Sequence, residues 1–234
     1  MAGSTRDDSL RSAMNELTRQ HLDSAPAIED TLAAVTAAAV EFIDGVDYAD
    51  VMLVRGEDFV SRAPTAPLVV DLDAEQLRLG EGPCLHAATT DTVVTCPDLT
   101  SDSRWPAFAA AAVKAGVQRM MSFPLYRDRN SAGALNLMGR GTVPIDREGQ
   151  AIAAMLATHA AVALIAADRL HQFETALASR DLIGQAKGIV MERFNIDAAD
   201  AFSLITRLSQ ETNTPVRTVA GSIARDRERS AEKG

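Results

Sequence analysis

The sequence has few of the residues on which most covalent and metal chemistry depends. Only two of its 234 residues are cysteine, Cys84 and Cys96, and their spacing fits neither a CxxC zinc motif nor a disulfide scaffold. The histidines, at positions 21, 86, 159 and 171, show no HExxH or HxH spacing, and no GxSxG elbow or GxxxxGK[ST] loop occurs. These absences argue against an enzyme, and we expect no metal and no cofactor.

Long apolar runs and a secretory leader are also missing. No stretch approaches the about 18 consecutive apolar residues of a membrane-spanning helix. The beginning, MAGSTRDDSLRSAM, contains acidic residues and lacks the apolar core of a signal peptide. Hydrophobic residues make up 47% and charged residues 24% of the chain, as in ordinary globular proteins. We therefore expect a cytoplasmic protein with no membrane partner.

The net charge of -9 is unevenly distributed along the chain. From Thr175 onward, nine Lys or Arg stand against eight Asp or Glu, whereas the first 174 residues hold fourteen against twenty-four. Such a difference suggests that the two parts of the chain have different partners.

The first half of the sequence alternates between helix and strand patterns. Apolar residues recur at helical spacing from Ile28 to Ile43, and Gly45 marks the end of that helix. We predict strands at 48–54, 67–73, 92–99, 117–128 and 131–141, and helices at 73–80 and 102–116. The segment LGEGPCLHAATT between them combines turn glycines with a short apolar helix. Because the last two strands are adjacent in the sequence, the pattern predicts an α+β domain with an antiparallel sheet at 25–145, after a flexible arm at 1–24.

Residues 146–194 contain no proline and have the pattern of one long helix. A heptad repeat runs along it, through Leu156, His159, Ala163, Ala166, Leu170, Phe173 and Leu177. Such a seam usually pairs with a second copy of the same helix. We therefore expect a parallel coiled-coil homodimer over 146–178, with docking of the helix on its own domain as the alternative.

Two shorter helices follow the long one. Asp197 and Asp200 give the first a carboxylate-rich first turn, and the second opens with Thr214 as cap and Pro215 at its first position. With the end of the long helix they predict a three-helix bundle at 176–224, before a charged tail at 225–234. Its two aromatic residues, Phe194 and Phe202, lie on apolar faces of these helices, so we do not expect base stacking to dominate any nucleic-acid contact.

Two glycines, Gly184 and Gly188, interrupt the helical segment IGQAKGIVMERFN. A glycine inside a helix costs roughly 1 kcal/mol relative to alanine, so two in one turn need a cause. Either neighbouring helices pack closely against them, or a ligand approaches the backbone there. The residues themselves leave both explanations open.

The words SR, QAKGI, MER, AF..L and VA..I within residues 176–224 resemble the ANTAR domain, an RNA-binding antitermination module of bacterial regulators. Upstream, LGEGPCL, DLTSDSRWPAF, SFPL and GALNLM resemble the GAF domains that precede ANTAR. The resemblance implies binding of paired RNA hairpins, whose loops present unstacked bases. It implies RNA contacts from Arg180, Gly184, Gln185, Ala186, Lys187, Gly188, Arg193, Arg217 and Thr218.

Two other functions compete with RNA binding. The GAF resemblance implies a small-molecule ligand, with Cys84, His86 and Trp105 as either pocket lining or core, and a sensor of this kind could act through protein contacts alone. The helices at 197–211 and 215–224 also imitate a DNA-binding helix-turn-helix. Against DNA, the second of these helices offers one arginine and few amide side chains to read bases.

Overall fold

The computed structural model describes residues 12, 28–55, 58–128, 131–141 and 143–231, so the predicted arm at 1–24 lies outside them apart from residue 12. The chain divides between Ala167 and Asp168 into two compact units.

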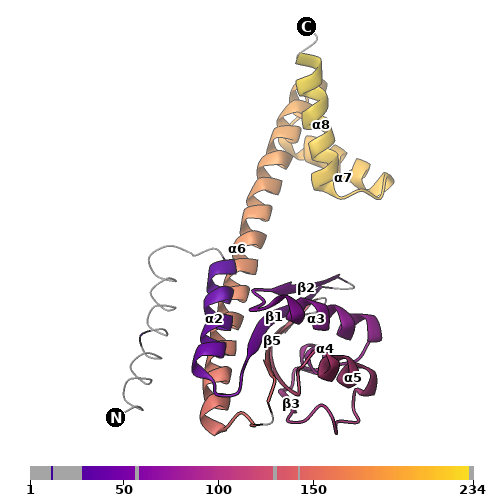
Figure 1. Cartoon of the computed structure of the whole chain (residues 1–234). Helices are drawn as coiled ribbons and strands as arrows, with labels where there is room; N and C mark the ends of the chain where they lie inside the picture. The colour runs from indigo at the N-terminus through magenta and orange to yellow at the C-terminus, as the bar shows by residue number, and fades with distance from the viewer. Residues whose placement is uncertain (1–11, 13–27, 56–57, 129–130, 142, 232–234) are drawn as a thin grey trace. The chain divides into compact units, whose positions relative to one another are not determined.

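The first unit is a five-stranded antiparallel sheet with helices on both faces (Figure 1), which confirms the α+β class. The strand order is β2-β1-β5-β4-β3, and every neighbouring pair is antiparallel. Its elements are α2 (Ile28–Phe42), β1 (Tyr48–Arg55), β2 (Asp58–Arg62), α3 (Pro67–Leu79), α4 (Pro83–Thr90), β3 (Val94–Cys96), α5 (Pro106–Lys114), β4 (Arg119–Asp128) and β5 (Ser131–Gly139).

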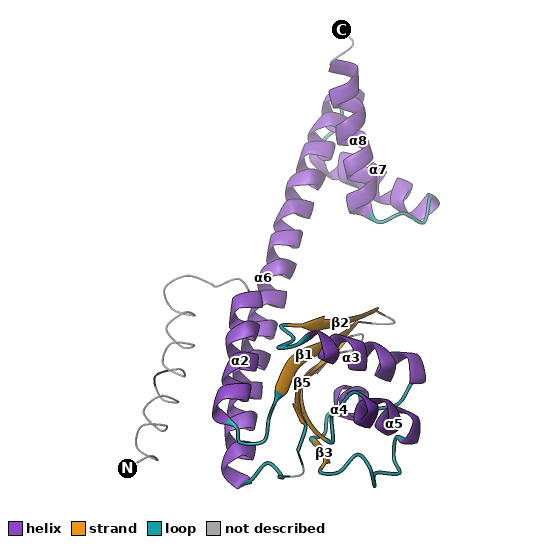
Figure 2. Ribbon diagram, in the orientation of Figure 1, coloured by secondary structure: helices purple, strands orange, loops and turns teal. Residues whose placement is uncertain are grey.

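Alternation of side chains along the strands gives the sheet two separate cores. Val51 and Leu135 pack with α2 and the first turns of α6 (Arg147–Phe194). Met52 and Met138 pack instead with α3, α4 and α5. The sheet is therefore the middle of three layers, as Figure 2 also shows.

The 48-residue helix α6 confirms the prediction of one long helix. By length and composition alone, α6 is apolar enough to cross a membrane. However, Ile152, Leu156 and Leu164 are buried in the core of the first unit, which accounts for the apolar character of this part of the helix. Leu156 and Ala163 are both buried in the single chain, so including them in a dimer seam was wrong, and His159 between them is half-buried.

The second unit consists of the end of α6, α7 (Ala198–Glu211) and α8 (Val216–Ala231), as predicted. Its core consists of Ala186, Val190, Ala201, Ile205, Val219 and Ala220. The Asp197 side chain caps α7 by accepting the N–H groups of Ala199 and Asp200, both at 2.9 Å. Helix α8 continues to Ala231, beyond the predicted end at 224.

Two local predictions in the first unit were wrong. Residues 67–73 begin α3 instead of forming a strand, because Pro67 opens a helix whose buried face includes Val69, Leu72 and Gln76. Helix α5 begins at Pro106 instead of at 102 or 103. A carboxylate far away in the sequence caps it: Glu81 Oε1 accepts the N–H groups of Ala107 and Phe108 at 2.7 and 2.9 Å.

Candidate functional site

The face of α6 that carries Gly184 and Gly188 is bare. Both glycines are exposed, and a Cβ atom placed on either would meet nothing within 4 Å. Close packing by α7 or α8 therefore does not explain these glycines. Their backbone is accessible to a molecule from outside the unit.

Ala186 lies on the opposite side of α6 from the two glycines. Its side chain is completely buried in the three-helix core, beside Val190 and Ala201. Two residues along an α-helix correspond to a turn of about 200°, so Gly184 and Gly188 point away from that core. The prediction that Ala186 belongs to the bare face was wrong, because it holds α6 against its neighbours.

Polar side chains surround the bare face. Lys187, between the two glycines in the sequence, is half-buried, and Arg180 and Gln185 are exposed. Neither Arg180 nor Lys187 takes part in an ion pair with another described residue. Both cations therefore remain available to an anionic ligand.

An exposed apolar stripe leads along α6 to this face. Leu170, Phe173 and Leu177 are 51%, 61% and 45% exposed, and Ala166 is also exposed. Arg180 lies seven residues after Phe173, and Gly184 lies seven residues after Leu177. After Leu177, the same face of α6 carries the basic side chain of Arg180 and then the bare backbone at Gly184.

Arg217 and Thr218 lie elsewhere, in a groove between α6 and α8. This groove has a volume of about 400 Å³ and is lined by Thr175, Ala178, Ser179, Leu182, Arg217, Thr218, Gly221 and Arg225. Leu182 packs against the three-helix core, whereas Gly184 points away from it. The structure thus does not bring Arg217 and Thr218 together with the two glycines.

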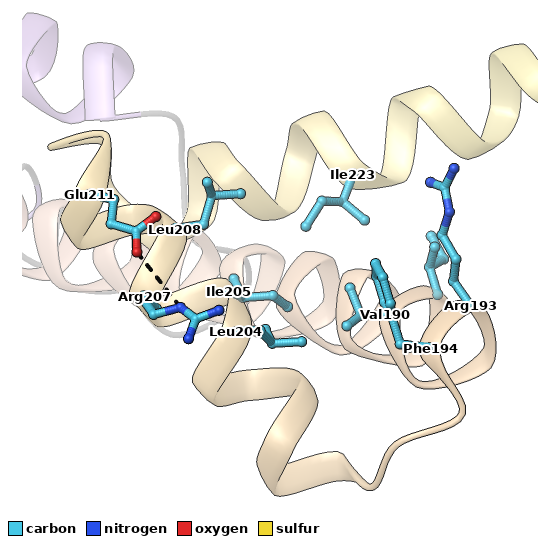
Figure 3. A pocket seen from close by; sticks show the side chains of 10 residues that line it. Val190, Arg193, Phe194, Leu204, Ile205, Arg207, Leu208, Glu211 and Ile223 are labelled. Carbon is cyan, nitrogen blue, oxygen red and sulfur yellow. Dashed lines mark ion pairs between the residues drawn. The ribbon is translucent and has the colours of Figure 1, made fainter.

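Arg193 lies in a third place, a groove of about 310 Å³ among the three helices (Figure 3). Its apolar lining includes Ile205 and Ile223, and at its rim Arg207 forms an ion pair with Glu211 at 3.7 Å. Phe194, which also lines this groove, is 61% exposed, and Phe202 is 46% exposed. Both aromatic rings are therefore accessible at the surface of the unit.

A buried polar row crosses the sheet of the first unit on the side of α3 and α4. Asp50, Asn136 and Ser122 are register partners on β1, β5 and β4, and none of them is exposed. Asn136 Nδ2 donates to Asp50 Oδ1 at 3.0 Å, and Ser61 Oγ donates to Asp50 Oδ2 at 3.2 Å. No motif in the sequence predicts this row, although the strand pattern of 48–54 places Asp50 on the same face as Met52.

Two helices complete the polar row with a second buried carboxyl group, Asp73. Gln76 Nε2 donates to Asp73 Oδ1 at 3.3 Å, and Gln76 Oε1 accepts the Cys84 N–H at 2.9 Å. Burial, followed by the charge of Asp73, raises the pKa of Asp50 well above its ordinary value, and burial raises the pKa of Asp73 to about 6. Asp73 Oδ2 and Asn136 Oδ1 have no hydrogen-bond partner among the described residues.

Comparison with known families identifies both units. Residues 25–165, more than half of the chain, match the GAF domain, and residues 171–223 match the ANTAR domain. The chain belongs to the GAF family and carries an ANTAR domain after it. This architecture is that of an RNA-binding antitermination regulator with a sensory domain, and both domains are of regulatory kinds.

Solved structures confirm the fold of the GAF domain. A GAF domain of a phosphoenolpyruvate-protein phosphotransferase from Coxiella burnetii is 15% identical with a TM-score of 0.51, the match covering 70% of this chain and 96% of that one. Free methionine-R-sulfoxide reductase from Neisseria meningitidis, in complex with its substrate, is 16% identical with a TM-score of 0.53, over 69% and 91%. At such identities the likeness concerns the fold alone. No curated protein matches the sequence.

The three predicted ligand residues of the GAF domain differ in exposure: Cys84 and Trp105 are buried and His86 is exposed. Cys84 is buried in the polar row, where Ser122 Oγ lies 3.6 Å from its sulfur. Burial raises the pKa of the Cys84 thiol well above its ordinary value, so the group stays protonated and is a poor nucleophile. The ring centroids of His86 and Trp105 lie 5.7 Å apart in an edge-to-face arrangement, with Trp105 in the core.

Proposed function

We propose that this protein is a cytoplasmic, homodimeric antitermination regulator whose ANTAR domain binds paired hairpins of a leader RNA through the bare face of α6. The open space at Gly184 and Gly188 carries this proposal. Sequence-specific RNA recognition targets loops whose bases are unstacked. Such bases approach a helix closely only where no side chain projects, and Lys187 adds a cation for a phosphate oxygen.

The exposed apolar stripe supports the dimer. Leu170, Phe173 and Leu177 lack cover in the single chain, and a second copy of the same helix offers a stripe with matching spacing. Arg180 follows on the same face, where two copies would oppose like charges. We therefore place the end of the apolar seam at Leu177. Each copy then offers one bare face, and two faces suit two hairpins.

Antitermination of this kind requires no covalent step. A leader transcript that folds into paired hairpins cannot use the same nucleotides in a terminator stem. Protein that binds only the paired hairpins stabilises that fold by RT ln(1 + [protein]/Kd). Transcription continues when this free energy exceeds the preference of the naked RNA for the terminator.

A gel shift tests the proposal, with paired-hairpin RNA and duplex DNA compared at about 0.15 M salt. We expect RNA to bind more tightly than DNA. Lys187→Ala should weaken RNA binding roughly threefold to tenfold through the lost phosphate contact, and Gly188→Glu should weaken it more by adding bulk and charge.

The GAF domain provides matched controls for both variants. Lys114 is an exposed lysine at the end of α5, and Gly141 is a glycine with open space around it. Lys114→Ala and Gly141→Glu should leave RNA affinity unchanged. Unchanged affinity in Lys187→Ala and Gly188→Glu as well would remove the bare face from the proposal.

A further inference from the structure

The groove between α6 and α8 has the chemistry of a phosphate-binding surface. Two arginines, three hydroxyl groups and the backbone of Gly221 line it, and no acidic side chain does. Arg217 and Thr218 lie in the first turn of α8, where the helix dipole also favours a negative charge. The groove therefore combines three features that favour an anion: two guanidinium groups, hydroxyl donors and the positive end of a helix.

The donors in this groove have no partner among the residues that the structure describes. Neither Arg217 nor Arg225 forms an ion pair with another described residue, whereas Arg207 in the neighbouring groove is paired with Glu211. The side-chain hydroxyls of Thr175, Ser179 and Thr218 likewise have no hydrogen-bond partner in the described part of the chain. These groups are free to bind a partner without breaking an existing contact.

Gly221 shapes the floor of the groove. A Cβ at this position would lie 3.3 Å from Nη1 of Arg225 and 3.4 Å from Cδ2 of Leu182. Its missing side chain thus lets α8 approach α6 and lets the Arg225 guanidinium lie back over the helix. Here, unlike at Gly184 and Gly188, a glycine serves packing within the domain.

We infer that this groove holds the sugar–phosphate backbone of the same leader RNA whose loop bases meet the bare face. The inference rests on the proposed function and assigns the two surfaces different tasks. Arginine forks and hydroxyl donors match phosphate oxygens and carry no base information, so the groove positions the RNA. The bare face distinguishes the loop sequence.

The test measures RNA affinity of the full chain over a series of salt concentrations. The double variant Arg217→Gln/Arg225→Gln should bind about tenfold more weakly, equally for every loop sequence. Its slope of log K against log salt should fall by about 1 to 2, since each lost phosphate contact removes about 0.7 to 0.9. Arg217→Lys/Arg225→Lys should keep the slope and recover part of the affinity, because lysine retains the charge without the fork.

Arg207→Gln is the matched control, as an exposed arginine of the same domain outside the groove. An equal loss of RNA affinity in this control, or an unchanged salt slope in the double glutamine variant, would show that the groove does not bind the RNA backbone. The proposed function would still stand. Absence of RNA binding by the unaltered protein overturns both. Thermal melts of each variant verify folding, and all three arginines are exposed, so we expect the melting temperatures to agree.

Discussion

Asp73→Asn should make the GAF domain more stable above neutral pH. The carboxyl groups of Asp50 and Asp73 are both fully buried, and their pKa values are raised in the folded protein. The folded state therefore binds protons more tightly than the unfolded chain. The contribution of protonated Asp73 to the free energy of unfolding is fully present at low pH. It is lost as pH rises from about 4, the pKa of an unfolded aspartate, through about 6, the pKa of folded Asp73.

The raised pKa of Asp73 sets the size of the effect. A shift of about 2 pH units is worth about 3 kcal/mol of unfolding free energy once the group is ionised. Asparagine at this position stays neutral, keeps the oxygen that accepts from Gln76, and places an amide donor where Asp73 Oδ2 now has no partner. The variant should match the unaltered protein at pH 4 and exceed its stability by about 3 kcal/mol at pH 8.

Urea unfolding of the full chain at several pH values measures this difference. Trp105 is the only tryptophan and belongs to the core that contains Cys84, so its fluorescence reports on the GAF domain alone. Asp71→Asn, at an exposed position of the same helix, is the control and should change little. Identical pH profiles for Asp73→Asn and the unaltered protein, or lower stability of the variant at pH 8, would refute the account of the buried pair.

Three further predictions concern the other elements. Gly188→Ala should stabilise α6 by up to about 1 kcal/mol yet weaken RNA binding, and a lower melting temperature would contradict the open space at this position. Glu81→Ala should destabilise the GAF domain by about 1 to 2 kcal/mol in the same fluorescence assay, because the N–H groups of Ala107 and Phe108 lose their acceptor. Phe173→Glu should convert the proposed dimer to a folded monomer in sedimentation, because Phe173 is 61% exposed in the single chain; a dimer that persists would exclude the seam.

Much of the architecture could be predicted because a long helix or strand repeats its apolar spacing many times, which identifies the element. The unbroken pattern of 146–194 predicted α6, and the acidic first turn at Asp197 predicted the start of α7. The strand predicted at 67–73 failed because a short apolar run fits a buried helix as well as a strand. Strand β2, only five residues long and rich in polar residues, carries too little pattern to be found.

The candidate site was predictable only in part. Mid-helix glycines at 184 and 188 are conspicuous in a sequence, and the structure places both on an open surface. By contrast, heptad spacing could not tell that Leu156 serves the core of its own domain while Leu177 is exposed. The polar row was missed because Asp50 and Asp73 come from separate elements, and only tertiary packing brings them together.

At Gly184 and Gly188, selection for a stable fold and selection for RNA binding should favour different residues. Folding of the ANTAR domain imposes no steric limit there, and almost any other residue would strengthen the helix. A saturation scan of these two codons, read once for protein abundance and once for reporter transcription, should therefore give opposite rankings. At Gly221, where α8 lies close to α6, the two rankings should agree.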